Sequence, residues 1–511
     1  MLARVLSSSL IGIDPYLVEV EVNVEGQAFR YNTVGLPEMA VRESKERVIS
    51  AIKNSGFRFP PKAYTINLAP ADVKKEGSAF DLPIAIGILA ALGIVIHEDL
   101  DDYVMLGEVS LDGSLRPIKG ALPSAVGVHE NKLKGLILPA QNAKEAAVTG
   151  DVDVIPVSTL LDAVLFLNGE KYIEPMEVDA ELLFSEAQNY QVDMSDVRGQ
   201  AHVKRALEVA AAGGHNVLMI GPPGSGKTML AKRFPTILPQ MTIDEALETT
   251  KIHSIAGLVK MEGLVATRPF RSPHHTISDA ALVGGGRIPR PGEVSLAHHG
   301  VLFLDELPEF QKNVLEVMRQ PLENTEVTIS RASMSLTYPA NFILLSAMNP
   351  CPCGYSSDPR HECTCSSMSI QKYMAKISGP LLDRIDLHIE VPAIPFEALA
   401  ARQDGEASQV VRKRVQGARN TQIKRFSSDG HLHSNADMQA KMIRTVCQID
   451  KPSAELLKSA ITNLGLSARA YDRILKVSRT IADLAGSSNI LAEHLSEAIQ
   501  YRTLDRQLWM T

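Results

Sequence analysis

The chain has 511 residues, more than the roughly 100–200 of a typical domain, so its length predicts several domains. Hydrophobic residues make up 45% and charged residues 22%, which is typical of a folded globular protein and excludes disordered, collagen-like and coiled-coil chains. The net charge of −7 excludes a uniformly basic nucleic-acid coat protein, so we expect any polyanion site to be a local patch.

The first residues lack the apolar stretch of a secretory signal, so we expect a cytoplasmic protein. Residues 82–96 are nearly all apolar, but a membrane span needs about 20 residues. This run also contains Pro83, Gly87 and Gly93. We therefore predict a buried core helix here and no contact with a membrane.

Residues 1–167 predict an α/β domain. Residues 16–24 and 63–68 alternate as strands do, and residues 38–54 have the spacing of an amphipathic helix. Residues 168–191 lack sustained periodicity and are predicted to be a linker.

Residues 192–395 read as strand, glycine loop, helix and strand, which predicts a nucleotide-binding α/β core. Residues 396–511 are mostly helical and are predicted to form a helical insert and a C-terminal lid. The basic stretch 400–430 indicates a solvated helix or linker, with a nucleic-acid arm as the alternative.

A phosphate-binding loop follows the apolar run 217–220. Residues 221–228, GPPGSGKT, match the whole pattern G-x-x-x-x-G-K-[ST] between a predicted strand and a predicted helix. Glycines let backbone N–H groups face a phosphate, and the helix start adds its dipole. We expect Lys227 to bridge the β- and γ-phosphates of ATP and Thr228 to hold Mg²⁺. The predicted nucleotide contacts are Gly221, Pro222, Pro223, Gly224, Ser225, Gly226, Lys227, Thr228 and Met229.

Two further apolar runs end in polar residues. Residues 300–304 lead into Asp305, predicted to hold Mg²⁺, and Glu306, predicted to activate the attacking water. Residues 342–348 lead into Asn349, whose amide could orient that water; the alternative is a turn-forming Asn before a proline.

Arg384 lies in the segment GPLLDRID, residues 379–386. An arginine at this point can complete the active site of a neighbouring subunit by neutralising transition-state charge. The alternative is a surface ion pair with Asp383 or Asp386.

These motifs in this order, GPPGSGKT, VLFLDE, AMNP and GPLLDRID, resemble those of an AAA+ ATPase. The segment 284–300 narrows the resemblance to the magnesium-chelatase-like branch, and the three-part order of nearly the whole chain resembles the YifB/ComM family. The resemblance implies a Lon-protease-like first domain, Asn349 as sensor 1 and Arg384 as a trans-acting arginine finger. It also implies Arg469 as sensor 2, with Arg473 as a rival for that role.

The matching stretches of the first domain lack a protease dyad. Alignment on the Lon pattern puts Ala79 at the nucleophile position and leaves Leu122 or Ser124 where the base would be. Without a nucleophile and a base no acyl-enzyme forms, so we expect an inactive domain that serves as a scaffold for oligomerisation or DNA. A displaced dyad of Ser78 and Lys119 is the alternative.

Four cysteines gather in the predicted insert 350–366, namely Cys351, Cys353, Cys363 and Cys365. Four thiolates suit a structural Zn²⁺ site, although only one residue separates the members of each pair. The resemblance supports zinc, because similar sequences carry a comparable Cys-Pro-Cys-Gly-Tyr insert. Free thiols and a redox pair are the alternatives, and His361 could replace one cysteine.

Two stretches are candidates for contact with DNA. The Gly- and Pro-rich loop from residue 268 onward carries Arg287 and Arg290, and two alternating strands flank Arg331. In related ring helicases a hairpin at the second place points into the pore, so the resemblance implies a sequence-independent grip of Arg331 on phosphate. The alternative is a surface hairpin in which Arg331 pairs with Glu323 or Glu326.

Together, the motifs and the resemblance imply a homohexameric ATPase that moves single-stranded, forked or junction DNA. Its expected role is branch migration, as a helicase in recombination during natural transformation, with recombination proteins as further partners. The alternative is a chelatase-type ATPase that remodels a protein partner or assists metal insertion. A nucleotide-gated scaffold is disfavoured because Asp305 and Glu306 are both present, and an ATP-dependent protease is disfavoured by the absent dyad.

Overall fold

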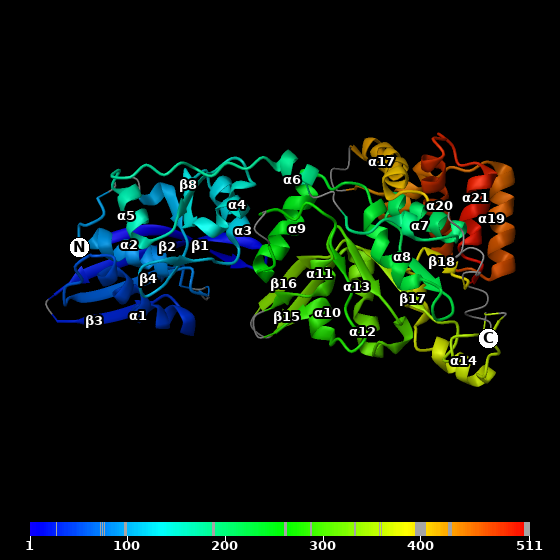
Figure 1. Cartoon of the computed structure of the whole chain (residues 1–511), viewed down its shortest axis with the longest axis horizontal. Helices are drawn as coiled ribbons and strands as arrows, with labels where there is room; N and C mark the ends of the chain where they lie inside the picture. Colours follow the sequence, from blue (N-terminus) through cyan, green and yellow to red (C-terminus); the bar gives the residue numbers. More distant parts are fainter. Residues whose placement is uncertain are drawn as a thin grey trace. The chain divides into compact units, whose positions relative to one another are not determined.

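The structure is a computed structural model of the chain (Figure 1), and it describes residues 1–26, 28–71, 73, 75, 77–96, 100–186, 190–259, 263–286, 289–331, 334–356, 358, 360–393, 405–427 and 432–504. These residues form two compact units. Unit 1 contains Met1–Glu186 and Ile243–Ala266, and unit 2 contains Ala187–Thr242 and Thr267–Thr511. Among the helices described, none combines the length and the apolar character needed to cross a membrane.

A seven-stranded mixed sheet in the order β3-β4-β2-β1-β5-β8-β9 forms the centre of unit 1. The β1–β2 and β2–β4 pairs are antiparallel, and the other neighbours are parallel. The strands are β1 (Leu2–Ile11), β2 (Asp14–Glu25), β3 (Arg30–Val34), β4 (Ala63–Ala69), β5 (Tyr103–Met105), β8 (Gly135–Pro139) and β9 (Asp153–Val157), with a hairpin of β6 (Glu108–Val109) and β7 (Leu115–Arg116). The helices are α1 (Met39–Asn54), α2 (Asp81–Ala91), α3 (Ala121–Glu130), α4 (Ala143–Ala147), α5 (Leu160–Leu167) and α6 (Ala180–Glu186).

Helix α2 is the predicted buried helix, and it packs against β1 and β2. Gly87 allows this close approach, because a Cβ there would lie 2.7 Å from Cγ2 of Val22. The helix ends at Ala91 and not at residue 96 as predicted, since Gly93 adopts a left-handed φ of +74°.

One helix of unit 1 is formed by residues that follow the phosphate loop in the sequence and precede the strand that leads into Asp305. Helix α9 (Ile243–Ala256) packs against α3. The Ser254 hydroxyl donates to the buried carboxylate of Glu145, which also accepts from the Leu122 N–H. The chain therefore leaves unit 2 at Thr242 and returns to it at Thr267.

Unit 2 is built on a parallel sheet in the order β11-β14-β17-β10-β18. Its strands are β10 (Val217–Ile220), β11 (Phe270–Arg271), β14 (Val301–Leu304), β17 (Ile343–Met348) and β18 (Leu387–Glu390). Most of their residues are buried, as expected of a parallel sheet covered on both faces. The strand order reverses at β10, and ligands bind open α/β sheets at the carboxyl end of such a switch point.

Helices surround the sheet of unit 2, and two hairpins extend from it (Figure 1). The helices before β18 are α7 (Ala201–Gly213), α8 (Lys227–Arg233), α10 (Asp279–Val283), α11 (Glu293–Leu296), α12 (Lys312–Val317), α13 (Arg319–Asn324), α14 (Ser367–Met374) and α15 (Gly379–Leu382). One hairpin pairs β12 (Gly284–Gly285) with β13 (Arg290–Pro291), and the other pairs β15 (Glu326–Arg331) with β16 (Met334–Pro339).

The C-terminal part is helical, as predicted. It contains α17 (Ser408–Arg425), α18 (Ala440–Val446), α19 (Lys451–Leu464), α20 (Ala468–Leu484) and α21 (Ala492–Gln500). These helices share one hydrophobic core with the sheet, since Ile474 and Ile481 belong to the same buried cluster as Val217 and Leu387. The predicted lid is thus continuous in packing with the sheet of unit 2.

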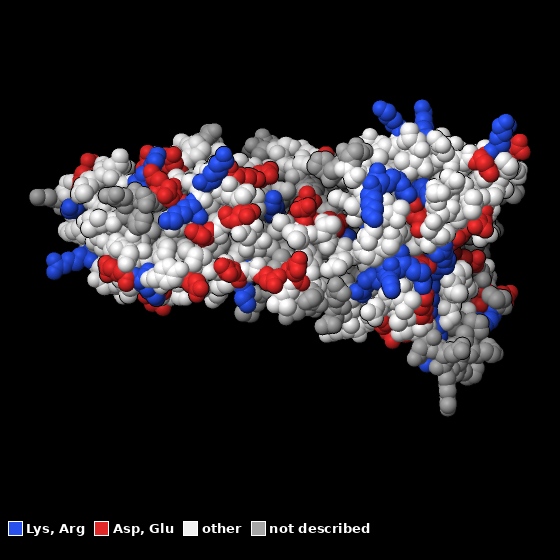
Figure 2. Space-filling model, turned by 90° about the horizontal axis from the view of Figure 1, so that it is seen from above, with Lys and Arg blue, Asp and Glu red and all other residues white. Residues whose placement is uncertain are grey.

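The basic stretch 400–430 is helical where it is described. Helix α17 buries Val411 and Val415 against the core, and its Arg414 and Arg425 form ion pairs within the chain. Arg414 lies 2.5 Å from carboxylate oxygens of both Glu208 and Glu406. Figure 2 shows Lys and Arg side chains gathered on the face of unit 2 where α17 lies.

Candidate functional site

The loop between β10 and α8 surrounds the ammonium group of Lys227. Its Nζ donates to the carbonyl oxygens of Gly221 at 2.6 Å and Pro222 at 2.9 Å, and to Oδ1 of Asn349 at 3.2 Å. Burial lowers the pKa of Lys227, and the nearby carboxylate of Asp305 opposes this shift. The cation therefore lies where the carboxyl ends of β10 and β17 meet.

The glycines of this loop are required by its backbone. A Cβ at Gly221 would lie 2.1 Å from the Val391 carbonyl oxygen, and Gly224 and Gly226 have φ values of +74° and +89°. The hydroxyl of Ser225 is fully buried and has no hydrogen-bond partner among the described residues. A buried hydroxyl without a partner beside such a loop fits a site that accepts a phosphate group.

Thr228 and Asp305 meet beside Lys227. The Thr228 hydroxyl donates to Oδ2 of Asp305 at 2.6 Å, and the N–H of Glu306 donates to the other oxygen of that carboxylate at 3.0 Å. A hydroxyl and a carboxylate are oxygen donors of the kind that Mg²⁺ prefers, so these two residues fit the predicted metal. Two protein ligands are enough for such a site, because Mg²⁺ usually keeps several water ligands.

Glu306 and Asn349 complete the cluster predicted from the sequence. Glu306 has a left-handed φ of +54°, a costly conformation for a non-glycine residue, and its exposed carboxylate lies 3.5 Å from Nδ1 of His275. Asn349 directly follows β17 and reaches Lys227. Met229 lies in the first turn of α8.

Arg384 is buried and does not pair with Asp383 or Asp386, so that alternative is wrong. Its Nη2 lies 2.6 Å from Oε1 of Glu323, and its Nη1 donates to the carbonyl oxygen of Pro380 at 2.6 Å.

The two candidates for sensor 2 lie on α20 and have different partners. The exposed Arg469 donates to Oε1 of Glu323 at 3.4 Å, whereas Arg473 forms an ion pair with the buried Asp386. Burial by itself would raise the pKa of the Asp386 carboxyl, but Arg473 and His215 hold it well below its ordinary value.

The two predicted DNA-binding stretches lie next to each other in unit 2. The hydroxyl of Tyr338 in β16 donates to the Pro289 carbonyl oxygen at 2.9 Å, and a Cβ at Gly284 in β12 would lie 2.6 Å from Cδ1 of Ile329. Arg290 is exposed, and Arg331 ends β15 opposite Met334. Arg287 lies outside the described residues.

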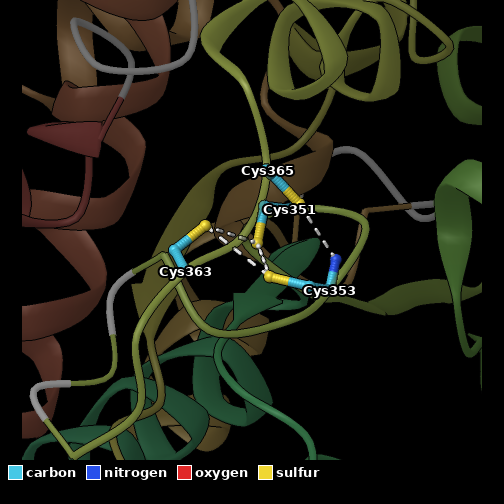
Figure 3. Close-up of side chains that lie close together, drawn as sticks. All are labelled: Cys351, Cys353, Cys363 and Cys365. Carbon is cyan, nitrogen blue, oxygen red and sulfur yellow. Dashed lines mark hydrogen bonds between the residues drawn. The ribbon is translucent and has the colours of Figure 1, made fainter.

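The four cysteines of the insert converge (Figure 3). The Sγ distances are 3.3 Å from Cys351 to Cys353, 3.6 Å from Cys353 to Cys363 and 3.8 Å from Cys351 to Cys363. Cys365 joins them, because all four Sγ atoms lie within 4.8 Å of one another. Four ligands at the usual Zn–S bond length of about 2.3 Å stand about 3.8 Å apart, so the cluster fits a tetrahedral Zn²⁺ site.

The thiols of the cluster differ in pKa. Hydrogen bonds from the Tyr355 N–H and from the Cys351 thiol lower the pKa of Cys353 to about 6, which favours a thiolate. A hydrogen bond from the Cys365 N–H lowers the pKa of Cys363, but burial and contacts with Cys353 and Cys351 outweigh it and raise this pKa to about 11. The pKa of Cys365 is raised as well. His361 is not needed as a ligand, since the four Sγ atoms gather without it and its Nδ1 lies 3.1 Å from a carboxylate oxygen of Asp358.

The cysteine cluster adjoins the phosphate loop. Gly354 has a φ of +91°, and a Cβ there would lie 2.5 Å from Cδ of Pro223. Cys351 follows Asn349 by two residues. The cysteine cluster and the phosphate loop, which are separate in the sequence, are therefore in contact in the structure.

Sequence reasoning did not assign roles to two residues in this region. Gln200 donates to the carbonyl oxygens of Ser225 at 2.8 Å and Pro392 at 3.1 Å, so it fastens the phosphate loop from the side. The sequence offers Glu323 as a partner of Arg331, whereas in the structure it contacts Arg384 and Arg469. No local pattern marks either residue, because their partners are distant in the sequence.

Three family models match the chain. They are described as magnesium chelatase, subunit ChlI, over residues 193–399, subunit ChlI of Mg-chelatase over residues 20–142, and the ChlI C-terminal region over residues 405–502. Together they cover parts of both units and the C-terminal helices.

Full-length relatives are also found. The competence protein ComM of Haemophilus influenzae is 45% identical over 512 residues, which covers 99% of this chain and 98% of that protein. The uncharacterized protein YifB of Escherichia coli is 43% identical over 509 residues, with the same coverage of both chains. The magnesium-chelatase 67 kDa subunit of Chlorobaculum tepidum is 28% identical over 165 residues, or 31% of this chain and 23% of that protein.

Proposed function

The chain belongs to the YifB/ComM family of magnesium-chelatase-like AAA+ proteins, and on this premise we propose that it is an ATP-driven, ring-forming DNA motor. Its proposed role is that of a branch-migration helicase in recombination during natural transformation. The observation that carries the ATPase is the meeting of Lys227, Thr228 and Asp305 at the carboxyl ends of β10 and β14, two strands of one parallel sheet that are separated by β17. ComM is named a competence protein, which supports the DNA role.

In the proposed reaction the chain binds the triphosphate of ATP and activates water. Lys227 exchanges its carbonyl partners for phosphate oxygens, and Thr228 and Asp305 hold Mg²⁺, which neutralises charge on the β- and γ-phosphates when bound. Glu306 accepts the proton of the attacking water, and Asn349 orients that water. Such a reaction is mostly positioning and electrostatics.

Arg384 is proposed to act on the ATP of an adjacent subunit in a homohexamer. The partners of its guanidinium group are Glu323 and Pro380, outside its own phosphate loop, in keeping with a role in trans. Arg469 is proposed as sensor 2, because Arg473 is already engaged with Asp386. A heterologous interface repeated around a ring brings each arginine to the next site.

DNA contact is proposed for the paired hairpins β12–β13 and β15–β16, through Arg290, Arg331 and Arg287. Adjacent cations give a salt-dependent grip on phosphates that does not depend on sequence. The N-terminal Lon-like domain is proposed as an inactive scaffold; the Ser78 hydroxyl donates to Glu108, and among the described residues no hydrogen bond joins Ser78 to Lys119, the other member of the displaced dyad. The cysteine cluster is proposed to hold structural Zn²⁺.

A chelatase-type ATPase that remodels a protein partner or assists metal insertion is the second candidate. The observation in its favour is that magnesium-chelatase models match residues 193–399 and 405–502. Against it stands the full-length identity to ComM, compared with 31% coverage by the chelatase subunit.

The test measures ATP hydrolysis without a polymer and with single-stranded, forked and four-way-junction DNA, and scores the strand products. We expect stimulation by at least one DNA. Arg331→Ala should remove the stimulation and leave basal hydrolysis unchanged, whereas Lys441→Ala, an exposed cation on α18, should change neither. Glu306→Gln should slow hydrolysis by about 10²–10⁴-fold while ATP still binds. Hydrolysis that no DNA stimulates would contradict the DNA motor and favour the chelatase-type candidate.

A further inference from the structure

One carboxylate oxygen of unit 2 serves two arginines with different proposed roles. Oε1 of Glu323, on α13, lies 2.6 Å from Nη2 of Arg384 and 3.4 Å from Nη2 of Arg469. Arg384 precedes β18 and Arg469 lies in the first turn of α20, so three separate segments meet at one atom. Hydrogen bonding to Arg384 is the main cause that lowers the pKa of the Glu323 carboxyl.

The two arginines differ sharply in exposure. The side chain of Arg384 is 4% exposed, whereas those of Glu323 and Arg469 are 50% and 56% exposed. A guanidinium that acts on another subunit must present its N–H groups outside its own chain. In this structure Arg384 is turned inward, with Pro380 as its second partner and with Nε unpaired among the described residues.

The segment that holds Arg384 is also fastened to α20. Ser467, the N-cap of that helix, donates to Asp383 at 3.4 Å, and Arg473 is paired with Asp386. Asp383 and Asp386 therefore contact the N-cap and the second turn of α20 directly. Arg384 is linked to Arg469, in the first turn of that helix, through Glu323. A shift of this helix changes the surroundings of Arg384 directly.

Two cations that share one oxygen compete for it, because each draws on the same negative charge and the cations repel each other. When Arg469 leaves Glu323, the attraction between the Glu323 carboxylate and the Arg384 guanidinium becomes stronger. When Arg469 returns, that attraction weakens. This coupling is reciprocal, as required of two ligands that compete for a common partner.

We propose that Glu323 is a positioning residue that keeps Arg384 withdrawn inside its own subunit, and that Arg469 controls this restraint by competing for the same carboxylate oxygen. This inference rests on the proposed function, in which Arg384 acts in trans and Arg469 contacts the subunit's own ATP. A subunit whose Arg469 is drawn to ATP then withholds Arg384 from its neighbour. When Arg469 shares Glu323, as it does in this structure, the carboxylate holds Arg384 less tightly, and the ATP of the next subunit then draws Arg384 away from it.

The first experiment compares basal ATP hydrolysis, without DNA, of the full-length protein and of Glu323→Gln. A neutral amide binds guanidinium more weakly than a carboxylate, so we expect basal turnover to rise about fivefold, the factor that corresponds to the difference between charged and neutral hydrogen bonds. The double variant Glu323→Gln, Arg384→Ala should lose this rise. Glu316→Gln is the matched control, since Glu316 pairs with Arg319 at 2.8 Å on the preceding helix. Basal turnover that stays unchanged or falls in a folded Glu323→Gln protein would overturn the inference.

Glu323→Asp keeps the charge and guards against a folding defect. We expect its basal turnover to lie close to that of the unaltered protein, and a rise equal to that of Glu323→Gln would count against a role of the charge. Nucleotide binding by each variant, followed with a fluorescent ATP analogue, confirms that the site is intact.

The second experiment does not depend on ATP hydrolysis. Phenylglyoxal modifies exposed arginines, and mass spectrometry reads the modified fraction of Arg384. We expect Glu323→Gln to raise this fraction severalfold and Glu316→Gln to leave it unchanged; equal modification of Arg384 in both variants would overturn the restraint. If the unaltered protein hydrolyses no ATP, the proposed function fails, while this measurement still decides whether Glu323 restrains Arg384.

Discussion

Asp386 is a buried carboxylate that joins the sheet of unit 2 to its C-terminal helices. It forms an ion pair with Arg473 of α20, accepts from the Asn216 N–H at 2.9 Å, and lies 3.6 Å from Nδ1 of the fully buried His215. The other ring nitrogen of His215 contacts the hydroxyl of Thr480 at 2.8 Å. Removing one member of such a network leaves the others buried without a partner.

We expect Asp386→Asn to destabilise unit 2 by about 3 kcal/mol at pH 7, because a buried ion pair loses one partner. The pKa of this carboxyl is lowered in the folded protein, so its stabilising contribution is present above the unfolded pKa of about 3.9. That contribution is lost as the pH falls toward the lower folded pKa. Urea unfolding should therefore show a large difference from the unaltered protein at pH 7 and a smaller one at pH 3. A difference that does not depend on pH would contradict this role.

The grouping of the residues proposed to bind phosphate could be predicted from the sequence because their spacing follows from local geometry. Lys227 and Thr228 belong to one loop, and Asp305 ends a strand that the apolar pattern identifies. Glu323 and Gln200 could not be predicted, since their roles depend on contacts with residues far away in the chain. Arg384 was predicted, but its partner was not.

At the scale of elements, the insert after β17 combines a metal-binding pattern with a contact to the phosphate loop. The cluster holds the turn that contains Gly354, and this turn packs against Pro223. Asn349, which reaches Lys227, directly precedes the insert. We therefore expect a loss of order in the insert to shift both Pro223 and Asn349 beside Lys227.

We expect protein purified without added metal to contain about one Zn²⁺ per chain, since four thiolates complete a structural site. Cys351→Ser and Cys363→Ser should lose the metal, and their turnover should fall by up to about 10²-fold, the usual cost of misplaced catalytic groups. Elemental analysis and a thiol-reagent titration that releases zinc are the measurements. Cys447→Ser is the control, because Cys447 is buried outside the cluster and burial raises its pKa to about 12. A metal-free unaltered protein would reject the site.

Several elements agree with the sequence prediction because their periodicity is regular. Helix α1 covers 39–54 of the predicted 38–54, β2 and β4 cover the predicted strands, and the hairpin around Arg331 is present. The one-residue spacing of the cysteine pairs weakens the zinc prediction. In the structure, a turn in which the Gly354 N–H donates to the Cys351 carbonyl oxygen at 3.0 Å brings Cys351 and Cys353 together.

At the scale of the whole molecule, the proposed ring makes each active site depend on two chains. In an equal mixture of Arg384→Ala and Glu306→Gln, a site works where the first variant supplies Glu306 and the second supplies Arg384. Random assembly gives this arrangement at about one quarter of the sites, so we expect about one quarter of the unaltered activity, although each variant alone is inactive.

The control for this mixture pairs Lys227→Ala with Glu306→Gln. Both changes damage the site of their own chain, so no arrangement restores a complete site and the activity should stay absent. Mass photometry or light scattering confirms that mixed rings form. A mixture of the first pair that remains inactive, or full turnover by a strict monomer, would contradict catalysis in trans.

The three predicted domains are continuous in sequence, so they place α9 in the predicted core 192–395. In the structure α9 belongs to unit 1. The sequence between the phosphate loop and Asp305 gave no sign that residues 243–266 pack with the first unit, because amphipathic periodicity identifies a helix and not its partner.

The position of α9 limits how related chains can be recombined in the laboratory. A chimera that takes residues 1–186 from one relative and the rest from another would place a foreign α9 against α3, with Ser254 and Glu145 drawn from different parents. Residues 243–266 must come from the same parent as residues 1–186. Because segments of the two units alternate along the sequence, a single crossover cannot exchange one unit for its counterpart.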